Sequence, residues 1–364
     1  MKQPTRILPP EQERRVRAMA RTATIRDVAA KAGVSIATVS RVLNGSGVTT
    51  PETAEKVRLA VAALTFRPST IGRSLKAART RTVGVLIPSL SNPVFAESVA
   101  GIQDAADEAG YSVLIASTDY SPDREARAIE SLLSNRVEGL VLTVADADRS
   151  ASLDTLDAAQ TPYVLVYNQP LTSGRAHVSV DNVAAARAIV ERMTALGHRR
   201  IGMVAGRFLH SDRSCRRHAG WLAALATAGL PAGPVIEVDF TDTRLATRLA
   251  PHLTGADRPT ALFASNDLLA LATIRAIRDL GLSVPGDVSV CGFDGIEVGA
   301  LVSPSLATLV QPARAMGRAA FETLRAGFAH EPQGAVLTLP FELRMGESLG
   351  PAPLAPAANP TPKS

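Results

Sequence analysis

The sequence contains, from Thr24 to Asn44, the stretch TIRDVAAKAGVSIATVSRVLN, whose pattern predicts two short helices joined at a glycine. Thr24 and Asp27 have the spacing of an N-terminal capping box. Apolar residues then recur at helical spacing until Gly33 breaks the run, and Ser35 is a suitable cap for the second helix. Two helices joined in this way are typical of a helix-turn-helix, which places its second helix in the major groove of DNA.

A third helix completes the small core of this predicted domain. It begins at Thr50, where a capping threonine, Pro51 and Glu52 follow one another, and its apolar residues again have helical spacing. In the second helix the residues expected to face the core are Val39, Val42 and Leu43, and those expected to face outward are Ile36, Ala37, Ser40 and Arg41. The alternative is a generic three-helix bundle in which Ile36 packs under a loop.

The outward face of the second helix carries side chains suited to reading DNA. Arg41 can form two hydrogen bonds to guanine, and Ile36 and Ala37 can contact thymine methyl groups. Hydroxyl and basic side chains near the helix N-terminus, such as Thr38 and Lys31, are expected to hold phosphates, which fix the register without reading sequence. The predicted DNA contacts in this domain are Thr24, Ile36, Ala37, Thr38, Ser40, Arg41 and Asn44.

Charge is distributed unevenly along the 364 residues. Residues 1–81 contain 16 Lys and Arg against 5 Asp and Glu, whereas the remainder contains 23 basic and 29 acidic residues. A basic N-terminal part joined to an acidic body is typical of a nucleic-acid-binding module attached to a second domain. Length gives the same indication, because a chain of this size commonly forms two or three domains.

Beyond residue 81, short apolar runs alternate with helical stretches. A first series of predicted strands comprises 83–87, 111–116, 139–143 and 163–167, and a second series comprises 200–205, 235–240, 261–264 and 288–293. Strands that alternate with helices predict parallel sheets. The sequence therefore predicts an α/β body of two doubly wound subdomains, in which a ligand binds beyond the carboxyl ends of the strands.

Polar and aromatic side chains gather where these predicted strands end. Carboxylates, amides and arginines can form paired hydrogen bonds to vicinal hydroxyls, and aromatic faces stack on the C–H surfaces of sugars. For Asn266 and Asp267 the alternative is a helix cap, and for Trp221 it is a place in the core. The predicted residues for binding a small molecule are Phe95, Tyr167, Arg213, Arg217, Trp221, Phe240, Asn266, Asp267 and Asp294.

An extended resemblance covers both domains. Residues 23–35, ATIRDVAAKAGVS, and residues 38–44, TVSRVLN, resemble the DNA-binding headpiece of the lactose-repressor (LacI-type) family of transcription regulators, and the resemblance continues to about residue 346. It implies a body similar to periplasmic sugar-binding proteins, which closes over a small-molecule effector, and a homodimer on a palindromic operator. The residues to which it assigns base reading are Ile36, Ala37 and Arg41.

The predicted hinge, residues 69–81, is basic and has few apolar residues, which is typical of a linker. In the family that the sequence resembles, this segment forms a helix on DNA and a leucine wedges between base pairs; the matching residue is Leu75. Ser69 stands where that family often has asparagine, and Gly72 where it usually has alanine. Glycine inside a helix costs about 1 kcal/mol relative to alanine, so we expect this hinge helix to fold less readily. The alternative is a linker in which Leu75 has no role.

The resemblance also assigns pocket roles within the body. The matching residues are Phe95, Arg217, Asn266, Asp267 and Asp294. At the end of the fourth strand the family often has aspartate, but this sequence has Tyr167. The arginines at 213, 216 and 217, with His210 and His218 nearby, suggest an anionic effector such as a sugar acid, and a neutral sugar is the alternative.

Other classes of protein are disfavoured. The sequence has no phosphate-cradling glycine loop, nucleophile elbow or histidine pair at metal spacing, so we expect no enzyme, metal or cofactor. Cys215 and Cys291 lack metal-ligand spacing, and Cys291 is expected to be a buried thiol in a strand. No apolar run approaches membrane-spanning length and no secretory signal is apparent, so we expect a cytoplasmic protein without membrane contact. The alternatives are a solute-binding receptor and an activator with the same effector fold.

Both ends of the chain are expected to be disordered. Residues 1–22 form a basic extension, unless translation begins at Met19. Residues 347–364 are rich in proline and alanine and lack heptads, which favours a dimer over a tetramer. The expected domains are therefore 23–68 for DNA binding, 69–81 for the hinge and 82–346 for effector binding and dimerisation. Induction is the expected response to the effector, and the sequence leaves corepression open.

Overall fold

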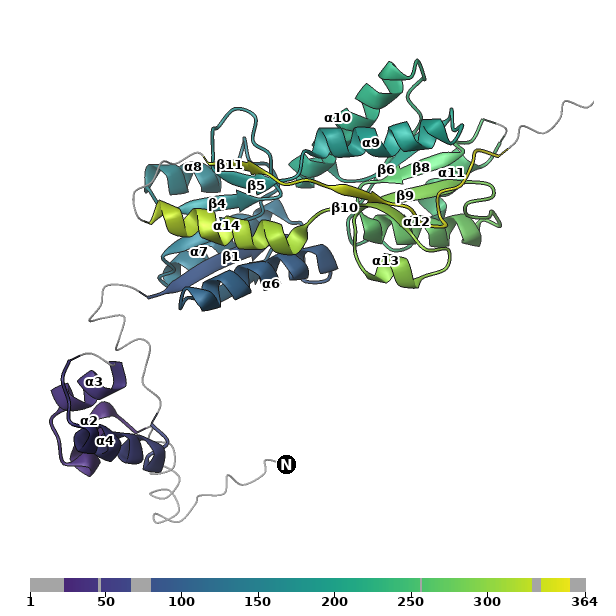
Figure 1. The fold of residues 1–364 in the computed structure, drawn as a ribbon. Helices are drawn as coiled ribbons and strands as arrows, with labels where there is room; N and C mark the ends of the chain where they lie inside the picture. The colour runs from purple at the N-terminus through teal and green to yellow at the C-terminus, as the bar shows by residue number, and fades with distance from the viewer. Residues whose placement is uncertain (1–22, 45–46, 67–79, 256, 329–334, 354–364) are drawn as a thin grey trace, which may run out of the picture. The chain divides into compact units, whose positions relative to one another are not determined.

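The computed structural model describes residues 23–44, 47–66, 80–255, 257–328 and 335–353 (Figure 1). The chain divides after Thr80 into two compact units. The expected basic extension at 1–22 and nearly all of the expected hinge, including Leu75, lie outside the described residues.

The N-terminal unit is the predicted three-helix domain. It contains α2 (Ile25–Ala32), α3 (Ile36–Asn44) and α4 (Pro51–Ala63). The capping box at Thr24 is confirmed, because the Thr24 side chain accepts a hydrogen bond from the Asp27 N–H while the Asp27 carboxylate accepts one from the Thr24 N–H. The helices meet through one fully buried valine from each of them: Val28, Val39 and Val57.

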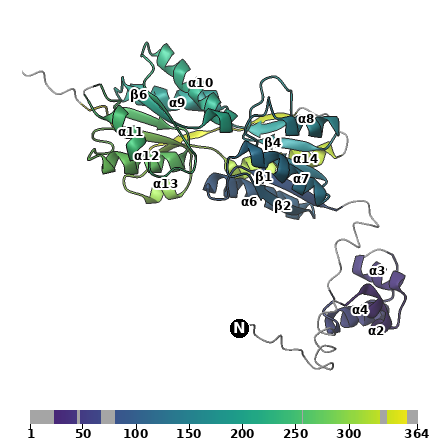
Figure 2. The ribbon, with the colours of Figure 1, turned by 180° about the vertical axis from the view of Figure 1, so that it is seen from behind.

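The C-terminal unit begins with a six-stranded parallel sheet, seen from opposite sides in Figures 1 and 2. In spatial order its strands are β11 (Val336–Thr338), β5 (His177–Ser179), β4 (Tyr163–Val166), β3 (Gly139–Leu142), β1 (Thr82–Ile87) and β2 (Ser112–Ser117). Residues of β1 alternate between two cores. Val83 and Val85 pack with α6 (Pro93–Glu108) and α14 (Ala313–Gly327), whereas Leu86 packs with α7 (Pro122–Ser134) and α8 (Ala151–Ala158). Helices therefore cover both faces of this sheet.

The second sheet has the same layered construction. In spatial order its strands are β12 (Glu342–Arg344), β10 (Ala307–Val310), β9 (Ser289–Asp294), β8 (Ala261–Ala264), β6 (Ile201–Gly206) and β7 (Val235–Val238). Only β12 is antiparallel to its neighbour. The helices are α9 (Asn182–Ala195) and α10 (Asp212–Thr227) on one face, and α11 (Ala246–Leu253) and α12 (Asp267–Asp279) on the other. Cys291 is buried in β9, as predicted.

Within the described residues the chain passes between the two sheets three times. The helix α9 follows β5 but packs with α10; α14 follows β10 but packs against α6 of the first sheet; and β12 follows β11 but pairs with β10. The crossing of α6 and α14 is close because Gly101 and Gly317 each face the backbone of the opposite helix. The sequence predicts one series of strands followed by a second series. It does not predict that the chain returns from the second sheet to the first.

The segment that follows β12 is packed as far as residue 353. Ser348 is fully buried, and its hydroxyl accepts a hydrogen bond from the Ala307 N–H (2.9 Å) and donates one to the Val290 carbonyl (2.7 Å). The Ala352 N–H donates to the Leu196 carbonyl at 2.9 Å. The domain boundary expected at residue 346 is therefore too early, because proline- and alanine-rich composition does not reveal such backbone hydrogen bonds. Residues 354–364 lie outside the described part.

Two kinds of feature are absent from the described residues. No helix among them is long and apolar enough to cross a membrane. In the same ranges, no three His, Cys, Asp or Glu side chains converge in a way that could hold a metal ion.

Candidate functional site

The outward face of α3 has the exposure that base reading requires. Ile36 is 43% exposed, and Ala37 and Arg41 are exposed as well. Water contact at an isoleucine is unfavourable, and contact with a thymine methyl group would remove that surface from water. The face that the sequence predicts for DNA contact is therefore open in the structure.

The polar residues predicted to contact DNA differ in their local bonds. The Thr24 hydroxyl donates to the Asp27 carboxylate at 2.7 Å, so it already takes part in the cap of α2. The Thr38 N–H donates to the Ser35 hydroxyl at 3.1 Å, which caps α3. Ser40 is half-buried, and the Asn44 side chain lies outside the description. The exposed candidates on α3 are therefore Ile36, Ala37 and Arg41.

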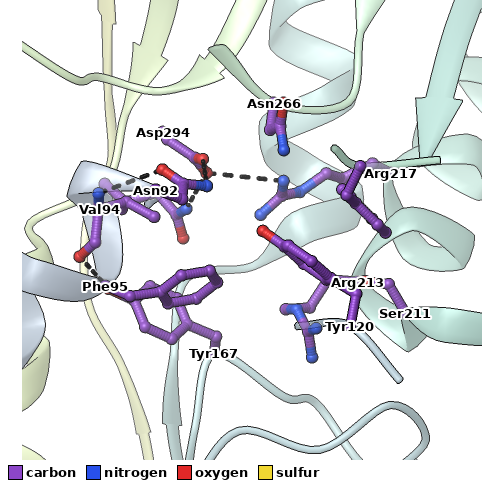
Figure 3. Close-up of a pocket in the computed structure, with 12 residues that line it drawn as sticks. Asn92, Val94, Phe95, Tyr120, Tyr167, Ser211, Arg213, Arg217, Asn266 and Asp294 are labelled. Atoms are coloured by element: carbon purple, nitrogen blue, oxygen red, sulfur yellow. Dashed lines mark hydrogen bonds and ion pairs between the residues drawn. The ribbon is translucent and has the colours of Figure 1, made fainter. Parts of the chain in front are cut away.

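A pocket lies between the two sheets of the C-terminal unit, with an empty volume of about 300 Å³ (Figure 3). The first sheet and its connections contribute Asn92, Val94, Phe95, Tyr120 and Tyr167. The second contributes Ser211, Arg213, Arg217, Phe240, Asn266, Asp294 and Gln311. Because both halves supply its walls, a ligand held there contacts both subdomains at once.

Asp294, the last residue of β9, organises the polar wall of the pocket (Figure 3). Its carboxylate accepts hydrogen bonds from Gln311 Nε2 (2.8 Å) and Asn92 Nδ2 (3.3 Å), and it lies 3.7 Å from Arg217 Nη1. Burial raises the pKa of Asp294, and the Arg217 charge opposes that shift. Asn92 belongs to the other subdomain, so this carboxylate links the two halves.

Arg217 projects into the pocket from α10. Its Nε donates to the Asn182 side-chain oxygen at 2.8 Å and its Nη1 donates to the Ser265 carbonyl at 2.5 Å. The guanidinium carbon lies 3.5 Å from the centroid of the Phe293 ring, in cation–π geometry. Burial lowers the pKa of Arg217 to about 10, while Asp294 opposes the shift, so the side chain stays charged at neutral pH.

Arg213, one helical turn before Arg217 on α10, also lines the pocket and ties α10 to the first subdomain. Its Nη1 donates to the Val144 carbonyl at 2.8 Å and lies 3.2 Å from the Asp212 carboxylate. That carboxylate also accepts from Asn168 Nδ2 at 2.7 Å and from the Ala147 N–H at 3.2 Å. Both pocket arginines are thus already paired with a carboxylate.

Aromatic rings form the remaining walls. Tyr120 stacks on Phe240 across the two subdomains, with ring centroids 4.2 Å apart and planes 10° apart. Phe95 meets Tyr167 edge to face at 5.3 Å, and the Tyr167 hydroxyl donates to the Val94 carbonyl at 3.0 Å. Burial raises the pKa of Tyr120 to about 12, so its hydroxyl is neutral at physiological pH and can donate a hydrogen bond.

The structure brings most of the predicted small-molecule-binding residues together. Those that line the pocket are Phe95, Tyr167, Arg213, Arg217, Phe240, Asn266 and Asp294. Trp221 does not reach it, because its side chain is fully buried in the core and stacks on His218. Asp267 does not reach it either: it accepts hydrogen bonds from the Gly295 and Ile296 N–H groups at 2.8 Å and from the Thr308 hydroxyl. For Trp221 the alternative, a place in the core, describes its position. Asp267 is not the helix cap that was its alternative, because Asn266 caps α12 and the Asp267 carboxylate holds the segment after β9.

Sequence reasoning missed five lining residues. They are Asn92, Val94, Tyr120, Ser211 and Gln311. Tyr120 lies shortly after the end of β2. The rule that ligands bind beyond the ends of parallel strands therefore predicts a place for it in the pocket. Gln311 follows β10, a strand of four residues that the sequence analysis did not predict.

A helix-turn-helix domain joined to a two-sheet body with a pocket between its halves defines a class: DNA-binding regulators that respond to a small molecule. Two family models match the chain. "Bacterial regulatory proteins, lacI family" covers residues 24–69, and "Periplasmic binding proteins and sugar binding domain of LacI family" covers residues 80–341. The chain therefore belongs to the LacI family of bacterial transcription regulators.

Individual relatives agree with this assignment. Catabolite control protein A of Priestia megaterium is 31% identical over 89% of this chain and 98% of its own length. The ribose operon repressor of Haemophilus influenzae is 34% identical over 83% of this chain and 91% of its own length. Among solved structures, the lac repressor dimer bound to operator and the anti-inducer ONPF is similar with a TM-score of 0.80 and 28% identity, over 91% of this chain and all of that chain.

Proposed function

We propose that this protein is a transcriptional repressor that binds a palindromic operator as a homodimer and whose operator affinity is controlled by a sugar or sugar acid. The observation that supports this proposal is the pocket itself, whose walls come from both subdomains of a chain that also carries a helix-turn-helix domain. A ligand that contacts both halves can favour one relation between them over another, and such a difference in affinity is what moves a two-state equilibrium.

The chemistry of the pocket fits a polyhydroxylated ligand. Carboxylate and amide acceptors of Asp294 and Asn266 face arginine and tyrosine donors, and Phe95 and Phe240 supply apolar surface for C–H groups. Arg213 and Arg217 are already balanced by Asp212 and Asp294 at 3.2 and 3.7 Å. An added negative charge would have to compete with these carboxylates, so the geometry favours a neutral sugar over a sugar acid.

The coupling between effector and operator is a difference of binding free energies. Couplings of this kind are typically about 1–3 kcal/mol, which corresponds to roughly 5- to 150-fold in affinity. We propose induction, in which the effector lowers operator affinity. A corepressor would use the same pocket with the opposite preference, and activation at some promoters requires no other fold.

Selection of genomic DNA fragments by the purified full-length protein tests the proposal. At near-physiological salt, where nonspecific attraction to the basic domain is screened, we expect enrichment of a short palindrome. Addition of a mixture of neutral sugars is expected to reduce that enrichment, and a mixture of sugar acids to have a smaller effect. Failure to enrich any palindrome, with and without the mixtures, would contradict the proposed function.

A further inference from the structure

A second cavity, with an empty volume of about 200 Å³, adjoins the pocket of Figure 3. Tyr120 and Arg213 border both cavities, so the two cavities share part of their walls. If the proposed effector function holds, we infer that the effector has two parts, as in a disaccharide, and that its second polyhydroxylated unit occupies this cavity. The following observations support the inference.

The cavity lies where a ligand of this fold can reach it. Its floor consists of residues that follow the first three strands of the first sheet, among them Thr118 after β2 and Thr143 after β3. His210 and Arg213, from the second subdomain, cover it. It is therefore a continuation of the crevice between the two subdomains and is separate from their packed cores.

Glu125 of α7 gives the cavity an acceptor that is only partly used. The residue is 8% exposed, and its two carboxylate oxygens accept one hydrogen bond each, from the Ala145 N–H (2.9 Å) and the Ser150 hydroxyl (3.2 Å). A carboxylate has about four lone-pair sites, so two remain. Within the part of the chain that the structure describes, Glu125 forms no ion pair, and a ligand hydroxyl that donates to it would supply a missing partner for a buried group.

Donor groups line the same cavity as this acceptor. Arg213 and His210 approach from the second subdomain, and Ser121 precedes α7 without a side-chain hydrogen bond to the helix N-terminus. Hydroxyl groups both donate and accept, so a sugar ring can satisfy such a mixed lining, whereas an anion would meet the Glu125 carboxylate and a cation would meet Arg213. The chemistry therefore favours a second sugar unit over a charged substituent.

One residue shared by the two cavities has an unusual backbone conformation. Tyr120, which borders both, has a left-handed φ of 58°, and so does Asp119 before it, at 50°. This uncommon backbone fixes the Tyr120 ring, which stacks on Phe240 and lines both cavities.

Calorimetric titration of the full chain with matched sugars tests the inference. The probes are glucose, galactose and fructose, and the disaccharides maltose, cellobiose, lactose, melibiose and sucrose. We expect at least one disaccharide to bind about tenfold or more tightly than either of its constituent monosaccharides. Monosaccharides that bind as tightly as every disaccharide containing them would overturn the inference but leave the proposed function intact. Binding of none of the probes would contradict both.

Two variants of the second cavity make the test specific. Ser121→Phe places a ring in the second cavity at a residue that does not line the first, and Glu125→Gln removes the carboxylate with little change in shape. Each is expected to reduce disaccharide binding about tenfold and to leave monosaccharide binding within about twofold. The control is Glu130→Gln, an exposed position on the same helix, which should change neither. Disaccharide binding that survives both cavity variants would place the second unit elsewhere and refute the inference.

Discussion

Single residues at the pocket adopt backbone conformations that few side chains tolerate. Asp294 has a φ of 125° and Tyr167 a φ of 70°, both in the region that favours glycine. Such backbone conformations cost about 1–3 kcal/mol of free energy each, and they persist where surrounding contacts hold the residue in place. Here the Gln311 amide holds Asp294 and the Val94 carbonyl holds Tyr167, so the walls are arranged before a ligand arrives. This arrangement is expected of a binding site rather than of a stable core.

We predict that two arginines have separate roles, one in operator binding and the other in the response to the effector. Arg41→Ala should weaken binding to the cognate operator by about 1–3 kcal/mol and relax base discrimination, because a bidentate contact to guanine contributes about that much. Arg217→Ala should leave operator affinity unchanged and abolish the effector response, because it removes the partner of Asp294 in the pocket. Fluorescence anisotropy with labelled operator, with and without effector, measures both quantities.

Matched controls make this division testable. Arg58→Ala removes an exposed arginine of α4 that pairs with Glu55, and Arg275→Ala removes an exposed arginine of α12 that pairs with Asp279. Both controls should behave as the unchanged protein. Equal loss of operator binding and effector response in Arg41→Ala and Arg217→Ala would contradict the separation of roles.

At the scale of helices and strands, sequence patterns predicted some features and missed others for identifiable reasons. Capping residues and helical spacing gave all three helices of the N-terminal unit, because these signals are local. The strands β5 and β11 have three residues each, which is too short for a pattern to distinguish them from a loop. Asn266 shows how one residue can serve twice: its side chain caps α12 by accepting from the Leu269 N–H at 2.8 Å, and it also lines the pocket.

Sequence patterns do not predict which sheet α14 packs against. Helical spacing shows that a segment has an apolar face, but it does not show which of two sheets that face covers. The structure places α14 against α6, on the first sheet, although it follows a strand of the second. Two glycines at the crossing, Gly101 and Gly317, are a trace of this contact in the sequence.

The α6–α14 crossing is predicted to tolerate no side chain. A Cβ at Gly317 would lie 1.9 Å from the Ser98 carbonyl oxygen, so Gly317→Ala must push the helices apart and should lower the free energy of unfolding by about 1–3 kcal/mol. Gly327→Ala, at the exposed end of the same helix, has no atom within 4 Å of the new Cβ and should be neutral or stabilising by up to about 1 kcal/mol. Urea unfolding monitored by circular dichroism compares the two variants. Equal effects would mean that the crossing is not rigid.

His198 is predicted to make the C-terminal segment sensitive to acid. The ring is fully buried and shares hydrogen bonds of 3.0 Å with the Thr260 hydroxyl and the Gly350 carbonyl. Burial lowers the pKa of His198 below its unfolded value of about 6.5, so its neutral form stabilises the fold. That contribution is fully present above about pH 6.5 and is lost as the pH falls through the lower folded-state pKa.

The measurement is the free energy of unfolding between pH 7.5 and about pH 5. In His198→Gln an uncharged amide can form the same two hydrogen bonds. We therefore expect the variant to lose less free energy of unfolding toward acid than the unchanged protein. The difference between the two slopes should be at most about 1.4 kcal/mol per pH unit, the value for one proton. Parallel profiles for the variant and the unchanged protein would show that His198 does not couple the C-terminal segment to pH.

For the whole molecule, the separation of charge along the chain predicts that its two binding activities respond differently to salt. The first 81 residues contain 16 basic and 5 acidic residues, so operator binding should release counterions from the phosphates. For about 6–10 phosphate contacts, operator affinity falls by roughly 10³- to 10⁵-fold between 50 and 200 mM salt. Binding of a neutral sugar involves no phosphate contact and should change little over the same range. Anisotropy and calorimetry on one preparation measure the two affinities.

A single lysine makes this prediction quantitative. Lys31 is exposed in the last turn of α2, and if it holds a phosphate, Lys31→Ala should reduce the slope of log affinity against log salt by about 1 for every operator sequence alike. Arg275→Ala, in the C-terminal unit, should leave the slope unchanged. A slope that Lys31→Ala does not alter would remove Lys31 from the phosphate contacts. Equal salt dependence for operator and effector would instead show that the effector carries charge, and it would contradict the neutral sugar that the paired arginines of the pocket favour.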